Sequence, residues 1–183
     1  MSFAIFVDGS SNLPGQLLRE LDICILPCTY SMNGNPSTYD GSLDSFDSHG
    51  YYDMLRRGGL VQTSLLNTQL FLDFFRPVLE QGKDVVYFSM SSGISGTCHA
   101  ARIAAQELLE EFPQRTVRVV DSMGSGFGTG LMACKAADLR SQGKDARETA
   151  DIMDADAQNT LQFFTVDDLN FLKRTGRVSG ATA

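Results

Sequence analysis

Short apolar segments alternate with helical patterns along most of the chain, and three of these segments end in small polar loops. Residues 3–8, 85–89 and 116–120 are nearly continuous apolar runs, which are typical of strands buried on both faces of a sheet. A helical pattern follows each of them. We therefore expect an α/β fold in which a parallel sheet carries helices on both faces.

The predicted elements also suggest how the chain divides into domains. Strands are expected at residues 3–8, 23–32, 85–89, 116–120 and 161–166, and helices at residues 13–21, 46–57, 67–79, 95–112, 131–139 and 146–158. The run Asn33-Gly34-Asn35-Pro36 is a turn signal. We expect residues 1–160 to form an N-terminal α/β domain. Residues 161–183 would begin a second, C-terminal α/β domain whose remainder is missing.

Composition and charge exclude several classes of protein. Hydrophobic residues make up 43% of the 183 residues and charged residues 20%, which suits a globular core. The formal charge of −7 argues against nucleic-acid binding, which needs dense Lys and Arg. Apolar runs fall well short of the roughly 20 residues that span a bilayer, so no stable membrane insertion is expected. The first residues lack the basic region of a signal peptide, and we expect a cytoplasmic protein.

The cysteines give no sign of a metal site. There are four of them, Cys24, Cys28, Cys98 and Cys134, and their spacing is not that of a secreted disulfide scaffold. A structural zinc site usually needs two tight ligand pairs, and only His49 and His99 could add to Cys24 and Cys28. We expect reduced, mostly buried thiols, with no metal and no cofactor.

The most informative segment is Ser89-Met-Ser-Ser-Gly-Ile-Ser-Gly-Thr97, which follows a strand and opens a helix. Small residues let a ligand approach the backbone, and the amides at a helix N-terminus favour an anion. One serine would be enough to cap the helix, so this density of serine and glycine favours an anion site. Its candidate residues are Ser92, Gly93, Ser95, Gly96 and Thr97.

Other polar loops are more ambiguous. Thr63 and Ser64 precede the 67–79 helix, which Asn67 alone could cap. Asp8, at the end of the first strand, is expected to accept hydrogen bonds from neighbouring loop amides. The glycines of residues 124–130 stand at every second position, so they fit a tight strand-to-helix turn better than a dinucleotide-binding loop.

An enzymatic alternative rests on Ser95 and His99. The Ser95 segment is similar to a nucleophile elbow, although Thr97 stands where its last glycine belongs. His99 could share a helix face with Ser95, but no orienting acid is evident. A serine acyl hydrolase is therefore the alternative hypothesis, while the favoured one has no catalytic residue.

Taken together, the motifs resemble those of the DegV family, in the family's order. The matching segments are Val7–Leu13, Tyr39-Asp40-Gly41, Thr63-Ser64, Ser91–Thr97, Val120-Asp121-Ser122 and Val166–Ser179. The serine-glycine loop and the final segment are the most specific. In the final segment Thr175 stands where the family usually has glycine.

The resemblance implies a two-domain protein that holds a long-chain fatty acid between its domains. Hydroxyls matching Thr63 and Ser95, with Ser64 and the loop residues Ser92, Gly93, Gly96 and Thr97, would bind the carboxylate. A separate fatty-acid kinase of the dihydroxyacetone-kinase type would then make the acyl phosphate. Arg174 or Arg177 would contact the head group or this partner. The family also uses a histidine from its C-terminal domain, and no residue of this chain matches it.

Overall fold

The structure is a computed structural model that describes residues 3–41, 43–44, 46–166, 169–174 and 176. Its centre is a parallel sheet in the order β2-β1-β6-β7. The strands are β1 (Phe3–Asp8), β2 (Ile23–Leu26), β6 (Asp84–Ser89) and β7 (Val117–Asp121). The predicted parallel α/β fold is confirmed.

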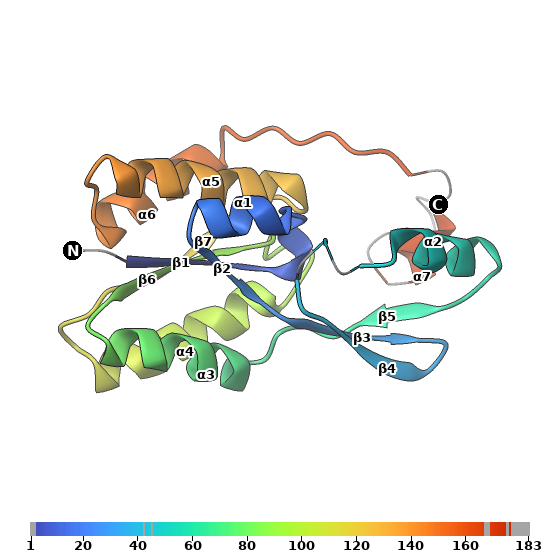
Figure 1. Ribbon diagram of the computed structural model, residues 1–183, viewed down its shortest axis with the longest axis horizontal. Helices are drawn as coiled ribbons and strands as arrows, with labels where there is room; N and C mark the ends of the chain where they lie inside the picture. Colours follow the sequence, from blue (N-terminus) through green and yellow to red (C-terminus); the bar gives the residue numbers. More distant parts are fainter. Residues whose placement is uncertain (1–2, 42, 45, 167–168, 175, 177–183) are drawn as a thin grey trace.

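Helices cover both faces of this sheet (Figure 1). On one face lie α1 (Gly15–Glu20), α5 (Phe127–Ser141) and α6 (Ala146–Ala157), and on the other lie α3 (Thr68–Glu80) and α4 (Thr97–Glu111). A short 3-10 turn, η1 (Gly9–Ser11), follows β1. Successive side chains of a strand point to opposite faces, so Val86 and Phe88 enter the α1/α5/α6 core while Val85 and Tyr87 enter the α3/α4 core.

A second sheet was not predicted. It is antiparallel, in the order β4-β3-β5, and is formed by β3 (Cys28–Met32), β4 (Asn35–Tyr39) and β5 (Val61–Thr63). Residues 23–32, predicted as one strand, are two strands in different sheets, because Pro27 has no N–H to continue the ladder. The predicted turn joins β3 to β4, with Asn33 and Gly34 at positive φ.

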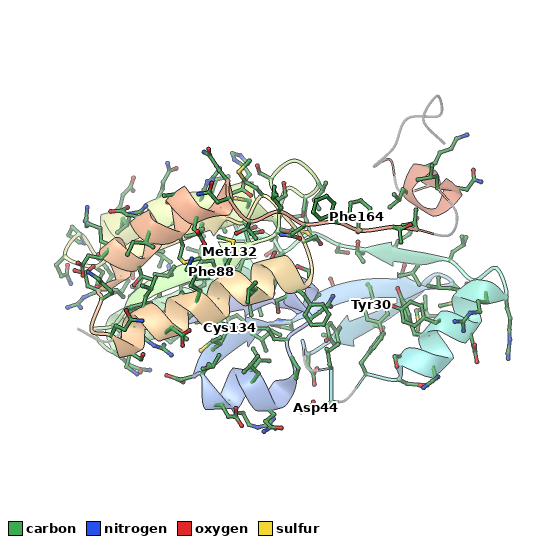
Figure 2. The ribbon with its side chains drawn as sticks, turned by 90° about the horizontal axis from the view of Figure 1, so that it is seen from above. Tyr30, Asp44, Phe88, Met132, Cys134 and Phe164 are labelled. Atoms are coloured by element: carbon green, nitrogen blue, oxygen red, sulfur yellow. The ribbon has the colours of Figure 1, made fainter. Side chains whose placement is uncertain are left out.

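The small sheet lies beyond the carboxyl edge of the parallel sheet, together with α2 (Ser48–Arg56) (Figure 1). Figure 2 shows Met132 and Phe88 within the helix-covered layers and Tyr30 at the other end of the molecule, in the small sheet next to α2. The space between the two sheets is where a ligand site is expected in an open α/β fold.

The prediction of a strand at residues 161–166 is wrong. These residues form an extended segment outside both sheets, and Phe163 and Phe164 are 91% and 82% exposed. A strand needs a neighbouring backbone to pair with, and the described part of the chain offers none here. A short helix, α7 (Asn170–Arg174), follows. The division into two domains remains a prediction.

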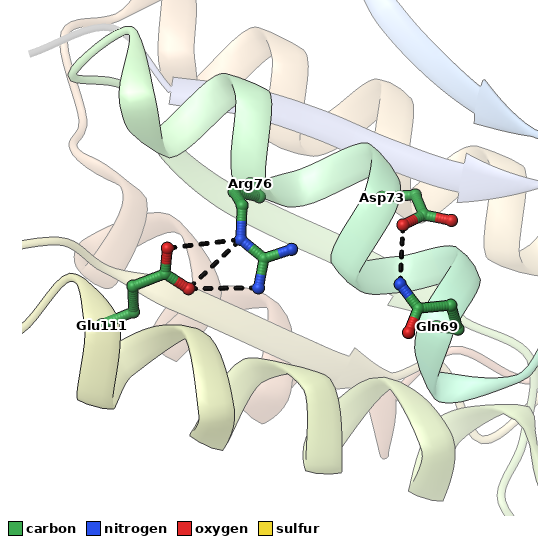
Figure 3. A network of polar contacts seen from close by, with 4 residues as sticks. All are labelled: Gln69, Asp73, Arg76 and Glu111. Atoms are coloured by element: carbon green, nitrogen blue, oxygen red, sulfur yellow. Dashed lines mark hydrogen bonds and ion pairs between the residues drawn. The ribbon is translucent and has the colours of Figure 1, made fainter.

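The outer surface of the α3/α4 layer carries ordinary solvated ion pairs. Arg76 on α3 donates from Nε and Nη2 to Oε2 of Glu111 on α4, at 3.1 Å each, and Gln69 donates to Asp73 along α3 (Figure 3). Such exposed pairs contribute little to stability. This surface therefore carries no candidate site.

Candidate functional site

A cavity of about 550 Å³ lies between the carboxyl edge of the parallel sheet and the small antiparallel sheet. Its walls are of two kinds. One part presents hydroxyl groups and a glycine, from Thr63, Ser64, Ser95, Gly96 and Thr97. The rest is largely apolar or aromatic, from Leu65, Leu66, Met90 and Ile94 and from Tyr30, Tyr39, Phe46, Tyr51 and Tyr52. The cavity therefore suits a ligand with a polar end and a long apolar part.

Thr97 links the two segments that carry the hydroxyls. Its Oγ1 accepts the amide of Leu66 at 3.3 Å and the hydroxyl of Ser95 at 3.0 Å, while its own amide donates to Ser95 Oγ at 3.2 Å. Thr97 is only 4% exposed. It therefore fixes the serine-glycine loop against the strand-end segment that contains Thr63 and Ser64.

Thr63 is positioned by the small antiparallel sheet. It is directly paired with Tyr30 across β5 and β3, so the two side chains share the face that lines the cavity. The amide of Ser64 donates to the carbonyl of Thr29 at 3.0 Å, which holds the end of β5. Both Thr63 and Ser64 are exposed. Asn67 caps α3 by accepting the amide of Leu70 at 2.9 Å, so the threonine and serine are not needed as caps.

Ser92 and Gly93 lie elsewhere in the loop and are not among the residues that line the cavity. The amide of Ser92 donates to the carboxylate of Asp121 at 3.2 Å, and the amide of Gly93 donates to Ser91 Oγ at 3.2 Å. Asp121 also accepts the amide of Met123 at 3.0 Å. Asp121 thus anchors the outer part of the loop, a role that its position after an apolar strand did not reveal.

Asp8 is buried at the edge of the cavity and its oxygens are well satisfied. As predicted, it accepts a neighbouring loop amide, that of Ser10 at 2.9 Å, and it also accepts the hydroxyl of Ser10. Its other oxygen accepts the hydroxyl of Tyr87 at 2.6 Å. Burial, together with the nearby Asp8 carboxylate, raises the pKa of Tyr87 well above its ordinary value, so Tyr87 stays a donor.

Cys28 lies near Asp8, but its thiol is a poor nucleophile. Burial, with a further contribution from Asp8, raises the pKa of the Cys28 thiol to about 11. The thiolate is the nucleophilic form, so Cys28 is unreactive near neutral pH. All four cysteines are free; Cys98 is buried and the others are half-buried.

The hydrolase hypothesis finds no support in the geometry. Ser95 precedes α4 rather than sharing its face, and its hydroxyl is engaged with Thr97. His99 is exposed and does not line the cavity. Within the described residues no hydrogen bond joins Ser95 to His99.

The glycine-rich segment is a strand-to-helix turn, as predicted. Gly126 has φ of +59°, a conformation that favours glycine. A Cβ at Gly130 would lie 2.7 Å from the carbonyl oxygen of Ser11, so this glycine lets α5 pack closely on η1. The segment is also contacted by Gln162, whose Oε1 accepts the amide of Ser125 at 3.0 Å.

The residues that the structure describes contain no group of three or more His, Cys, Asp or Glu residues placed to hold a metal ion. None of their helices combines the length and the apolar character that a membrane span requires. Arg177 lies outside the described residues, and Arg174 ends α7 with a side chain that also lies outside them. Their predicted contact with a head group or partner stays a prediction.

The aromatic side chains that line the cavity were not predicted from the sequence. Tyr30, Tyr39, Phe46, Tyr51 and Tyr52 come from β3, β4, the following loop and α2, segments to which no role had been given. One signal was available. The helical pattern at 46–57 has few apolar residues besides its aromatics, so these aromatics had no packed core to fill.

The fold and site first define a class: an α/β domain with an amphipathic ligand cavity at the carboxyl edge of its parallel sheet. Comparison with known proteins then identifies the family. A sequence model of a protein family, described as uncharacterised protein, DegV family, matches residues 2–183. The chain belongs to the DegV family. A DegV domain-containing protein of Clostridium perfringens is 32% identical over 182 residues, which is 99% of this chain and 62% of the relative.

Solved structures agree with this assignment. The chain is similar to a fatty-acid-binding DegV family protein from Thermus thermophilus, with a TM-score of 0.82 and 27% identity over 100% of this chain and 62% of that one. It is also similar to a stearic-acid-binding protein from Eubacterium ventriosum, with a TM-score of 0.81 and 27% identity over 98% of this chain and 63% of that one. The chain thus spans just over three-fifths of the length of these relatives.

Proposed function

We propose that the protein binds a long-chain fatty acid, with the carboxylate at the hydroxyls of Thr63, Ser64 and Ser95 and the acyl tail along the aromatic side chains that line the cavity. The observation that carries the proposal is the amphipathic cavity of about 550 Å³, which has hydroxyls on one part of its wall and apolar side chains on the rest. The fatty acids named for the proteins from Thermus thermophilus and Eubacterium ventriosum support the choice of ligand.

Hydroxyl groups can bind a carboxylate without help from a cofactor. Hydrogen bonds to a charged group contribute roughly 1.5–3 kcal/mol each. Among the described lining residues, Asp8 is the one that carries a formal charge, and its oxygens already accept bonds from Ser10 and Tyr87. The Asp8 carboxylate therefore already has its own donors. The hydroxyls of Thr63 and Ser64, and that of Ser95 once it turns away from Thr97, would bind the ligand carboxylate.

The tail contributes most of the affinity. Burial of a methylene is worth about 0.8 kcal/mol, so an acid that buries a dozen or so methylenes would gain about 10 kcal/mol before the losses on binding. The aromatic side chains Tyr51 and Phe46 line the cavity and are only half-buried. A bound tail would cover them, which gives these partly exposed aromatic groups a function.

The head-group assignment is tested with a Thr63→Ala and Ser95→Ala double variant. Loss of two charge-assisted bonds should weaken oleate binding by at least about a hundredfold, measured by isothermal titration calorimetry. Ser92→Ala is the matched control, because it removes a hydroxyl from the same loop but outside the cavity lining. Equal oleate affinity in the double variant and the wild type would refute the assignment.

We further propose that the bound acid is presented to a separate fatty-acid kinase of the dihydroxyacetone-kinase type. The family resemblance of the segment with Arg174 and Arg177 supports this step, since these arginines could contact an acidic partner. Replacing both arginines with Glu should abolish acyl phosphate formation by the kinase while leaving oleate affinity unchanged. Unchanged acyl phosphate formation by this variant would show that the two arginines do not contact the kinase.

A further inference from the structure

A second cavity, of about 520 Å³, adjoins the first. It lies between the small sheet and α2. Met32 on β3 and Met54 on α2 are its aliphatic lining residues, and a polar part of its wall is formed by Asn33, Asn35, Thr38, Asp40 and Asp47. Four aromatic residues line both cavities: Tyr30, Tyr39, Phe46 and Tyr51. These four residues, here called the aromatic wall, separate the two spaces.

Three members of the aromatic wall, Tyr39, Phe46 and Tyr51, form a continuous row of ring contacts. The Tyr39 and Phe46 rings lie 5.4 Å apart at 62°, and the Phe46 and Tyr51 rings lie 5.2 Å apart at 57°. These are favourable tilted arrangements. Phe46 is the central member, with a ring neighbour on each side. Removing its ring would open the wall at its middle.

The two ends of the wall have different neighbours. Tyr30 is paired with Thr63 and so lies beside the proposed head-group site. Tyr39 packs over Gly9, where a Cβ would come within 2.8 Å of its ring, and its hydroxyl donates to the carbonyl of Gly41 at 2.9 Å. Members of the wall thus lie both beside Thr63 and over the turn that follows β1.

We infer that the aromatic wall sets the acyl chain length that the protein accepts, by ending the tail site at the first cavity and closing off the second. This inference rests on the proposed fatty-acid binding. Each methylene buried in the first cavity should raise affinity about fourfold, and methylenes beyond the wall should add nothing. A plot of affinity against chain length should therefore rise and then level off.

Phe46→Ala is the decisive variant. Its side chain lacks polar atoms and lies outside both hydrophobic cores, so the substitution removes volume from the wall without breaking a hydrogen bond or a packed interior. In Phe46→Ala, the level part of the plot should move to acids at least about two methylenes longer, since the tail can continue into the second cavity. Affinity for these longer acids should rise by about tenfold or more relative to wild type.

A double variant tests whether the second cavity receives the tail. Of the two cavities, Met54 lines only the second, so the larger ring of Met54→Trp should narrow the path of a tail into that space. In the Phe46→Ala background it should restore the wild-type chain-length limit. Phe74→Ala serves as the matched control, because Phe74 lies on α3, is 37% exposed and lines neither cavity.

The measurement is competition between a fluorescent fatty acid and saturated acids of increasing length, on the full chain and its variants. A limit that moves in Phe46→Ala, returns with Met54→Trp and is unchanged in Phe74→Ala would support the inference. The same limit in Phe46→Ala and wild type would overturn it while leaving fatty-acid binding intact. Absence of binding by every acid to the wild type would instead overturn the proposed function itself.

Discussion

The two sheets of the molecule are packed very differently. In the parallel sheet, Val85, Val86, Tyr87 and Phe88 have no exposed surface. In the antiparallel sheet, which the structure describes in full, no residue of β3, β4 or β5 is buried, and the same holds for α2. A densely packed interior leaves no space for a ligand. The cavities therefore occur where the protein is loosely packed, and a bound tail would complete that packing.

The largest expected effect is a difference in stability between a variant of the parallel-sheet core and a variant of α2, beside the small sheet. Phe88→Ala leaves a cavity in the α1/α5/α6 core and should lower the free energy of unfolding by about 3–5 kcal/mol. Tyr52→Ala, which removes a 53% exposed ring from α2, should change it by no more than about 0.5 kcal/mol. Urea denaturation of both variants measures the difference, and similar losses would show that the small sheet is part of the same cooperative core.

The difference between the regions also explains how much could be predicted from sequence. The buried strand at Val85 is a continuous apolar run, and the strand at Val117 is interrupted only by Arg118 before it ends at Asp121. This pattern is typical of a covered parallel sheet. The small sheet has no such pattern, because its strands are short and solvated on one face. Strand β5, with only Val61-Gln62-Thr63, carries no recognisable periodicity and takes its structure from pairing with β3.

The candidate site divides in the same way. Ser95 and Thr97 could be found because an unusual density of small hydroxyl residues follows a predictable strand. Thr63 was supported only by family resemblance, since its position in the wall of the cavity that Ser95 also lines depends on the unpredicted pairing with Tyr30. Asp121 was not identified because its partner, the Ser92 amide, is 29 residues away in the chain. Long-range hydrogen bonds of this kind leave no local sequence pattern.

A smaller effect concerns the buried contact where the two regions meet. Tyr87→Phe removes the hydrogen bond to the Asp8 carboxylate and should cost about 1.5–3 kcal/mol of unfolding free energy at neutral pH. Chemical denaturation at pH 7 measures this loss. A neutral result would mean that Asp8 finds another donor when Tyr87 is lost.

The same residue gives a pH dependence. Burial raises the pKa of Tyr87 above its ordinary value of about 10, so the folded state holds the phenolic proton more tightly than the unfolded state. The resulting stabilisation is complete below pH 10 and is lost as the pH rises through the folded pKa. Wild type should therefore lose stability above pH 10 more steeply than Tyr87→Phe, as followed by thermal unfolding. Parallel curves for the two proteins would contradict the expected shift.

The smallest effects compare two equivalent helix caps, one in each region. Asn67 caps α3 by accepting the Leu70 amide at 2.9 Å, and Asp47 caps α2 by accepting the Gly50 amide at 3.0 Å. Loss of such a cap typically costs about 1 kcal/mol. Asn67→Ala should lower global stability by about that amount, because α3 is part of a buried core.

Asp47→Ala should leave global stability almost unchanged, since α2 has no buried residue that ties it to the core. Its effect should instead be faster amide hydrogen exchange confined to α2 and the neighbouring strands, because weakly packed segments open locally before the protein unfolds. Saturating oleate should slow this exchange again if the tail packs against α2. Equal losses of global stability in the two cap variants would mean that α2 unfolds with the core, and the small sheet would then be a rigid part of the site rather than one that the ligand orders.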